Sequence, residues 1–184
     1  SVTDHHLHLS QLADRLRSHN IFVRASKCIF YVPEVEYLGY LISGDAVRVL
    51  PDRVQGVLNV QPPRNRKELR QFLGLTGQFR HLIYHYAETA APLEQIKHKH
   101  SSRPFDLSPG SSAERAFLAL KQALIEMPSL AIPDTNLPFI AYVDASEVAM
   151  SMVLCQDQDG ERKVISFYSK AFTAAELKWS IPVK

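Results

Sequence analysis

The spacing of apolar side chains changes along the chain, and each spacing predicts a kind of element. Over residues 4–20 apolar side chains recur every three or four positions, which predicts an amphipathic helix. Two apolar runs follow, 28–32 and 35–42, and they predict two strands separated by a proline turn. A third, shorter strand is expected at 47–50, after a Gly-Asp turn.

Helical spacing returns in the middle of the chain. Pro51 opens a helical region, and Asn65 followed by Glu68 is the capping-box pattern of a helix N-terminus. The apolar residues after this pattern keep three- and four-residue steps as far as Ile83, which predicts one long amphipathic helix. Two further helices are expected on either side of a linker rich in Ser, Pro and His: 90–97, the linker 98–112, and 113–126.

After Pro133 the apolar period becomes two, which is typical of strands. Asp159-Gly160 is a strong signal for a hairpin turn. Thr173 begins a further helical pattern. The expected strands cover 139–144, 150–156 and 163–168, so the whole pattern predicts an α+β protein.

Composition narrows the picture only a little. The 184 residues are 46% hydrophobic and 22% charged, with a formal charge of +2 and a pI near 8.5. This balance permits nucleic-acid binding without indicating it, since a diagnostic domain usually has a pI above about 9. Cys28 and Cys155 lie far apart without ligand-like spacing, so we expect reduced thiols in an intracellular protein. No apolar run approaches the roughly 20 residues that span a bilayer, and no targeting signal is recognisable.

Four motifs follow one another over nearly the whole chain: 16–43 with its Tyr-Leu-Gly-Tyr-Leu-Ile-Ser ending, 67–80 with Ala90-Ala-Pro-Leu93, 116–134, and Tyr142-Val-Asp-Ala-Ser146. Together they resemble the polyprotein polymerase of gypsy-type LTR retrotransposons, a reverse transcriptase with an RNase H domain. The resemblance implies four parts of an α+β fold. These are the C-terminal part of the palm with a remnant hairpin (1–50), the helical thumb (51–98), a linker with a connector helix (99–136), and the N-terminal part of an RNase H-like sheet (137–184).

The resemblance implies an RNA–DNA hybrid or a primer–template duplex as partner, gripped by the thumb helix. Arg70, Gly74 and Gln78 recur every four residues, opposite the apolar stripe. A glycine there lets a nucleic-acid backbone come close, while Arg and Gln reach sugar, phosphate or minor-groove atoms. Lys67 and Arg64 extend the basic side toward the helix N-terminus, which itself favours phosphate. The alternative is an ordinary solvated helix face.

A second contact is implied at Leu38, Gly39 and Tyr40, which resemble the hairpin that grips the primer strand. On the residues alone, this segment is equally a buried strand with a glycine bulge. The histidines give no competing metal site, since no acidic or cysteine partners complete a tetrahedral set around them.

By resemblance, Asp144 is the first Mg²⁺ ligand of the RNase H site; the alternative is a strand-end aspartate that accepts backbone hydrogen bonds. RNase H cleavage uses two metal ions, and one carboxylate cannot hold both against water. The next carboxylate of the family would fall just past Lys184, and the Tyr-x-Asp-Asp turn of the polymerase is absent from these residues. We therefore expect an incomplete metal site and no Mg²⁺ bound by this chain alone. Ala149 and Ser151 also stand where the family has Gly-x-Gly.

Three interpretations stay open. The chain is a fragment of a retroelement polymerase, itself inactive, that contributes primer–template grip and one RNase H ligand. Alternatively, it is a non-catalytic subunit retained in a larger protein or RNA–protein assembly, or a partial sequence of an active element, since it begins with Ser1. Three strands are close to the minimum for a stable sheet, and an uncharged edge invites pairing. We therefore expect another chain or a continuation to cover 138–184 and make Phe139–Val143 inaccessible.

Overall fold

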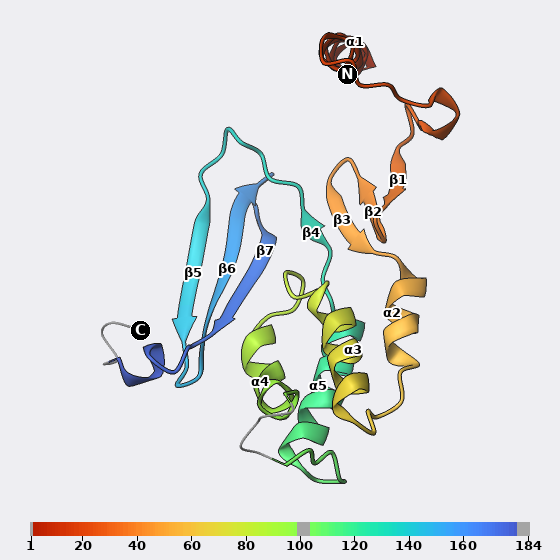
Figure 1. Cartoon of the computed structure of the whole chain (residues 1–184). Coiled ribbons are helices and arrows are strands. Elements are labelled where there is room, and N and C mark those ends of the chain that lie inside the picture. The colour runs from red at the N-terminus through yellow and green to blue at the C-terminus, as the bar shows by residue number, and fades with distance from the viewer. Residues whose placement is uncertain (1, 99–103, 180–184) are drawn as a thin grey trace. The chain divides into compact units, whose positions relative to one another are not determined.

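The computed structural model describes residues 2–98 and 104–179, and the chain divides into two compact units, Ser1–Val35 and Glu36–Lys184 (Figure 1). Helices and antiparallel sheets together give the α+β class that the sequence predicts. Among the described residues, the helices are too short or too polar to cross a bilayer.

The first unit contains one long helix, α1 (Val2–Ser18), and the short 3-10 helix η1 (Ala25–Lys27). None of the residues of α1 is buried, and its apolar side lines a groove of about 700 Å³ with the segment that follows. The strand predicted at 28–32 is wrong, because these residues form no strand. A strand needs a hydrogen-bonded neighbour, and the described part of this unit offers none to 28–32.

A four-stranded sheet has the order β1-β2-β3-β4, with β1 at Glu34–Tyr37, β2 at Tyr40–Ser43, β3 at Ala46–Val49 and β4 at Leu130–Ala131. The single strand predicted at 35–42 is wrong. A turn divides it at Leu38 and Gly39, whose φ angles of 51° and 91° both lie in the left-handed region. Two successive positive φ angles make the tight turn that joins antiparallel strands. The strand predicted at 47–50 is confirmed as β3.

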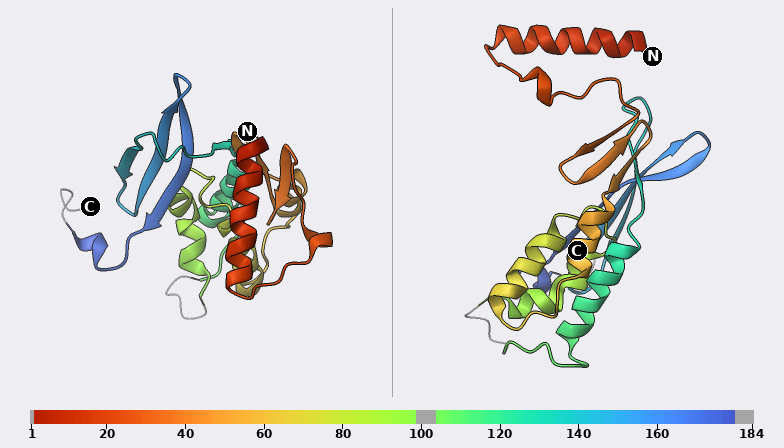
Figure 2. Two further views of the ribbon diagram at one scale, coloured as in Figure 1. Left: turned by 90° about the horizontal axis from the view of Figure 1, so that it is seen from above. Right: turned by 90° about the vertical axis from the view of Figure 1, so that its right-hand side faces the viewer.

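Four helices follow one another from Pro51 onward: α2 (Pro51–Leu58), α3 (Arg66–Gly77), α4 (Tyr86–Ile96) and α5 (Ser112–Ile125). Figure 2 shows them gathered into one group. Their apolar faces meet in a core around Leu69, Phe72, Leu93, Phe117 and Leu120, which are all at most 1% exposed. The rings of Phe72 and Phe117 are 4.6 Å apart.

The cap of α3 is confirmed in detail. The Asn65 side chain accepts hydrogen bonds from the backbone N–H groups of Lys67 and Glu68, both at 3.0 Å. The Glu68 carboxylate accepts from the backbone N–H of Arg64 at 2.7 Å. The helix ends at Gly77, however, and not at Ile83 as predicted. Phe79, Leu82 and Ile83 are buried as predicted, but they lie in turns between α3 and α4.

A second sheet is formed by β5 (Ile140–Ala145), β6 (Ala149–Gln158) and β7 (Glu161–Ala171), all antiparallel and in that order. All three strands are confirmed, as is the hairpin turn at Asp159 and Gly160, which have φ angles of 55° and 81°. The helix predicted from Thr173 is present only as the 3-10 helix η2 (Glu176–Lys178), and residues 180–184 lie outside the described part.

One face of this second sheet packs on the helices, while its edge strand is open. Phe167 and Val164 pack against the helical core, and α4 contacts β6 and β7. The strand β5 pairs with β6 and forms an edge. Phe139 and Tyr142 are each 50% exposed and Val143 is 64% exposed. The prediction that these residues are inaccessible is therefore wrong for the chain by itself, and any cover must come from outside the described residues.

Candidate nucleic-acid interface and the Asp144 edge

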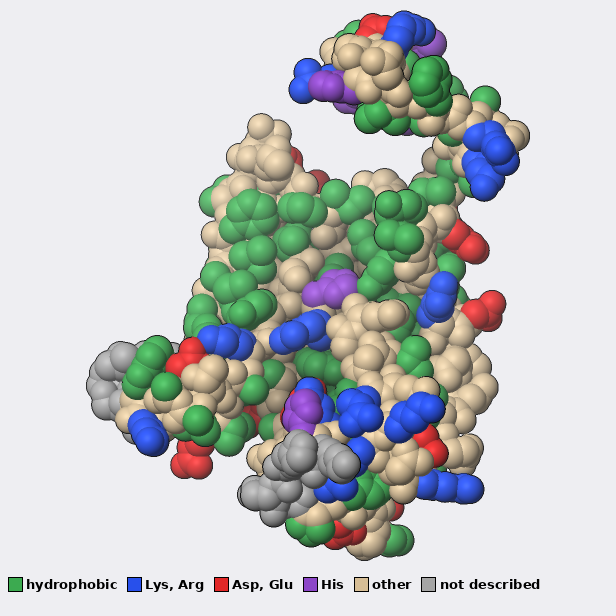
Figure 3. Space-filling view, viewed as in Figure 1, with side chains coloured by type: hydrophobic (Ala, Val, Ile, Leu, Met, Phe, Trp, Pro, Cys, Tyr) green, Lys and Arg blue, Asp and Glu red, His purple; other side chains and the backbone are tan. Residues whose placement is uncertain are grey.

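The outward face of α3 has the arrangement that the sequence predicts. Lys67, Arg70, Gly74 and Gln78 are exposed, on the side away from the buried stripe. Lys and Arg side chains gather over the lower, helical part of this surface (Figure 3). Gly74 has open space around it, because a Cβ built there would meet no heavy atom within 4 Å. The face is therefore accessible to a large ligand.

A groove of about 700 Å³ runs beside Gly74 and Gln78. Its other polar walls are the amides of Gln61 and Gln71 and the carboxylate of Glu68, with the apolar side chain of Leu75 beside them. Gln61 and Gln71 were not predicted as site residues. Their amides carry both donors and acceptors, which suits sugar hydroxyls and base edges better than phosphates. The four-residue spacing of the predicted row gave no signal for them. Gln61 lies before the helix begins, and Gln71 is one position away from the row.

Arg70 is placed differently from the other predicted contacts. Its Nη1 donates to the carbonyl oxygen of Lys97 at 3.2 Å, and the Nε of Arg66 donates to that of Ile96 at 3.1 Å. Both arginines thus satisfy carbonyl groups at the C-terminal end of α4, where a positive charge also complements the helix dipole. Arg70 does not line the groove, although a guanidinium has five N–H groups and one bond leaves others available.

The N-terminus of α3 is already occupied by its own cap. The N–H groups of Lys67 and Glu68 are bonded to Asn65, and the Glu68 carboxylate adds negative charge at the same end. A phosphate there would have to displace Asn65 and approach Glu68. The expectation that this end favours phosphate is therefore not supported by its geometry, and the exposed Lys67 and Arg64 side chains are the phosphate contacts that stay available.

The Leu38–Tyr40 turn presents one outward and one inward side chain. Leu38 is 78% exposed at the tip, so the interpretation of a buried strand with a bulge is wrong there. Tyr40 instead donates from its hydroxyl to the backbone oxygen of Gln78 at 3.3 Å, and its ring meets those of Phe79 and His81. Burial raises the pKa of Tyr40, and burial also lowers the pKa of His81. Tyr40 therefore ties the hairpin to the end of α3.

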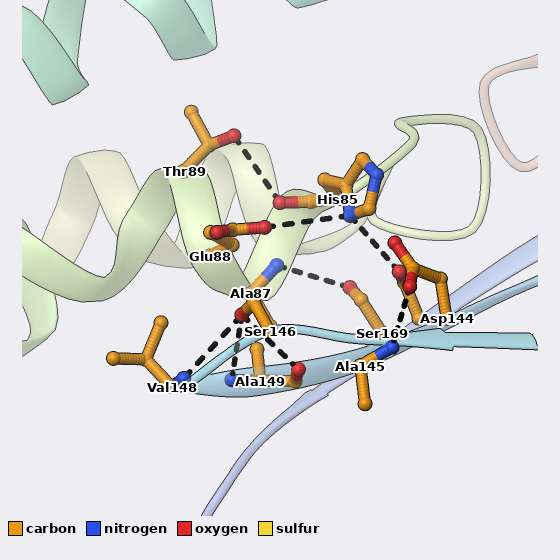
Figure 4. Close-up of polar contacts among 11 residues, drawn as sticks. His85, Ala87, Glu88, Thr89, Asp144, Ala145, Ser146, Val148, Ala149 and Ser169 are labelled. Carbon is orange, nitrogen blue, oxygen red and sulfur yellow. Dashed lines mark hydrogen bonds and ion pairs between the residues drawn. The ribbon is translucent and has the colours of Figure 1, made fainter.

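Asp144 lies on the exposed edge strand β5, where its Oδ1 accepts from the N–H of Ala145 at 2.9 Å (Figure 4). In the sheet register it is opposite Ser151, which is opposite Ser169. Directly opposed residues of an antiparallel sheet share a face, so these three side chains form a row. Among the described residues, no group of three or more His, Cys, Asp or Glu side chains converges for a metal ion. Asp144 alone does not fit a two-ion site.

The buried end of this row meets the start of α4. The Ser151 hydroxyl lies 2.9 Å from Nδ1 of His85, and a Glu88 oxygen lies 3.5 Å from the same nitrogen. A serine nucleophile needs its histidine to face the serine with one nitrogen and the carboxylate with the other. Here both contacts use Nδ1, and Ser151 is 4% exposed, so the three residues do not form a nucleophilic triad.

The departure from Gly-x-Gly has a physical account. Ala149 and Ser151 are both 4% exposed, so the positions at which glycine would admit a substrate backbone are covered within this chain. The hydroxymethyl group that replaces a glycine hydrogen at Ser151 makes the contact with His85 through its hydroxyl. The serine of the Asp-Ala-Ser motif, Ser146, accepts from the N–H groups of Val148 and Ala149 and shapes the β5–β6 turn. Neither His85 nor Ser169 was predicted, and the serine in place of glycine was the signal for this contact.

Several known proteins are similar in sequence to this chain. Residues 110–184 match the family model described as an RNase H-like domain found in reverse transcriptase. An uncharacterized mitochondrial protein of Arabidopsis thaliana is 35% identical over 138 residues, which cover 74% of this chain and 84% of that protein. The Pol polyprotein of the Drosophila melanogaster transposon opus is 33% identical over 170 residues, or 88% of this chain. This chain belongs to the reverse transcriptase–RNase H family of retroelements.

The retroelement chain is much shorter than the polyproteins it matches. It spans 17% of the opus polyprotein and 14% of the Tf2-3 polyprotein of Schizosaccharomyces pombe, to which it is 29% identical over 185 residues. A foamy viral protease–reverse transcriptase, solved in complex with an RNA/DNA hybrid, has the same fold over 98% of this chain with a TM-score of 0.74. At 23% identity, that likeness concerns the fold alone. Endogenous retroviruses match as well as retrotransposons, so the gypsy type stays a prediction.

Proposed function

We propose that this chain is the part of a retroelement reverse transcriptase that grips an RNA–DNA hybrid or a primer–template duplex with α3. The observation that carries the proposal is the open groove beside Gly74 and Gln78, on the exposed side of a helix whose other side is fully buried. The fold of a reverse transcriptase that was solved on an RNA/DNA hybrid supports it.

The chemistry of the groove suits the minor-groove side of a duplex. At Gly74 the backbone of a bound strand can approach the helix closely, because no heavy atom lies within 4 Å of the Cβ position. The amides of Gln71 and Gln78 can donate to and accept from base edges and 2′-hydroxyls. The ammonium of Lys67 is exposed on the same side for a phosphate. Leu38, at the tip of the hairpin that Tyr40 fastens to α3, is the apolar contact that this surface adds.

We propose that Asp144 is one ligand of an RNase H site that residues 1–184 do not complete. Mg²⁺, which the family uses, would supply the charge that stabilises the scissile phosphate when it is held by several carboxylates. Among the described residues, no group of three or more His, Cys, Asp or Glu side chains forms around Asp144. What the chain itself supplies is one exposed carboxylate, oriented by the N–H of Ala145.

A second candidate function is a non-catalytic subunit retained in a larger assembly. The burial of Ala149 and Ser151 favours it, because this face of the sheet serves packing against α4 rather than access to a substrate. The two functions differ in one property. A grip binds hybrid through α3, whereas a purely structural subunit does not.

The test is a fluorescence-anisotropy titration of a labelled RNA–DNA hybrid with the full chain. The double variant Arg70→Ala, Gln78→Ala should weaken binding and reduce the slope of log affinity against log salt by about one unit, for one lost phosphate contact. The matched control is Arg66→Ala, which also removes a guanidinium that donates to the C-terminal end of α4, but from a position outside the exposed row. Equal affinities for the double variant and the control would refute the grip.

A further inference from the structure

The helices and the second sheet are joined by polar contacts as well as by packing. We propose that Ser169 and Arg80 are positioning residues, which lock the sheet carrying Asp144 onto the first turn of α4 so that both move as one body. The locking itself is independent of ligand. Its consequence for catalysis rests on the proposed function, since a hybrid gripped by α3 would then reach the Asp144 edge at a fixed spacing.

Ser169 is the centre of the lock. It lies on β7 and is 1% exposed, and its hydroxyl accepts from the backbone N–H of Ala87 at 3.0 Å (Figure 4). Ala87 is the second residue of α4, and the first N–H groups of a helix have no partner within it. A side chain of the sheet therefore caps the helix, a task that usually falls to a residue of the same segment. His85 stands at the cap position itself, but its side chain makes no cap bond.

Arg80 adds a second tie to the same residue. Its guanidinium donates to the backbone oxygen of Ser169 and lies 5.8 Å from the ring centre of Tyr86. One residue of β7 thus holds the start of α4 through its side chain and the segment just after α3 through its backbone. The hydroxyl and the backbone oxygen of Ser169 therefore both accept hydrogen bonds from the helical region.

Two neighbouring contacts extend the lock along the strands. The backbone N–H of Phe167 donates to the oxygen of His81 at 2.9 Å, so the outer edge of β7 is bonded to the α3–α4 segment. The Ser151 hydroxyl meets His85 on the next strand. Apolar packing alone would let the sheet shift along the helix, but these bonds fix one register. Sliding would leave buried polar groups unpaired, which is costly.

The row across the sheet links the lock to Asp144. Ser169, Ser151 and Asp144 are opposite one another on three adjacent strands. The two buried members, Ser169 and Ser151, are held by the start of α4, and the exposed member, Asp144, carries the carboxylate. Asp144 itself makes none of these bonds, so the lock positions it only through the sheet.

The first test measures the distance between the two parts in the full chain. Spin labels are placed through a keto-bearing amino acid at Gln71 on α3 and at Val143 on β5, both exposed. The unaltered chain should give one narrow distance distribution, and Ser169→Ala combined with Arg80→Ala should broaden it at least twofold. When Arg80→Lys takes the place of Arg80→Ala in this double variant, the ammonium can still donate to the backbone oxygen of residue 169, and most of the narrow distribution should be restored.

The matched control for this test is Ser166→Ala. Ser166 lies on the same strand, but its hydroxyl reaches only the neighbouring oxygen of Phe167. A distribution for the double variant as narrow as that for Ser166→Ala overturns the proposal. Two or more separate distances between the spin labels in the unaltered chain would also overturn the proposal. Neither result touches the hybrid-binding titration, so failure of the lock and failure of the grip are distinguished.

A second measurement covers the case in which the double variant does not fold. Amide hydrogen exchange of the unaltered chain should protect Ala87 and Phe167 to within about tenfold of Leu120, in the helical core, because a locked sheet opens only with that core. Exchange more than about a hundredfold faster at both residues would show that the sheet detaches by itself, and would overturn the proposal.

Discussion

Gly74 allows stability and binding to be separated by a single methyl group. It is the ninth residue of α3, and the Cβ of an alanine there would enter open space. Alanine is favoured over glycine inside a helix by about 1 kcal/mol. Gly74→Ala should therefore raise the free energy of unfolding by roughly 0.5–1 kcal/mol, equivalent to about 1–4 °C in Tm for a chain of this size.

The same methyl group projects into the space where a bound strand would approach α3. We expect Gly74→Ala to weaken hybrid binding about tenfold, or ~1.4 kcal/mol, although the protein becomes more stable. Gly56→Ala is the matched control, because Gly56 is also helical, exposed and without a heavy atom near its Cβ position. Thermal unfolding and hybrid anisotropy are measured for both variants. Gains in stability with equal hybrid affinity would show that no ligand approaches Gly74.

Three further predictions concern the Asn65 cap of α3, stability at acid pH, and cleavage of an RNA–DNA hybrid. Asn65→Ala should lower the unfolding free energy by about 1–2 kcal/mol in chemical denaturation, because it leaves two N–H groups of α3 without their acceptor. The Lys170 ammonium, and then the N–H of Thr173, lower the pKa of Glu176 to about 2, so the stability this carboxylate gives is complete above about pH 4.5 and is lost as the pH falls through 2. NMR shifts of Thr173 should follow that change and be constant in Glu176→Gln. Residues 1–184 should not cleave an RNA–DNA hybrid in Mg²⁺, and cleavage that Asp144→Asn abolishes would contradict this.

The elements that the sequence predicted well are those with a strong local signal. The cap at Asn65 and Glu68 is confirmed because both partners lie within one turn, and the Asp159-Gly160 turn because its left-handed geometry suits these residue types. The elements predicted wrongly depended on distant partners. Residues 28–32 have strand-forming side chains, but no described strand pairs with them. β4, which was not predicted, has only two residues and exists because β3 is beside it.

Periodicity also failed to show where α3 ends. Phe79, Leu82 and Ile83 continue the three- and four-residue steps and are buried as expected, yet they lie in successive turns. A run of short turns buries side chains at nearly the same intervals as a helix. For the candidate site, exposure of the predicted face followed from the apolar stripe on the other side of α3. The bond from Arg70 to Lys97 did not, because it joins two helices whose arrangement depends on the tertiary fold.

The pairing of β3 with β4 brings Val47 next to Leu130, from opposite sides of all four helices α2 to α5. The helical region is thus an insertion into a sheet that starts before it and closes after it. During synthesis, the edge of β3 stays unpaired until the whole insertion has been made, and contacts between such distant residues form slowly. A piece cut between α4 and α5 would lose β4 and leave that edge open to other chains. The helices cannot be isolated at that point without exposing a strand.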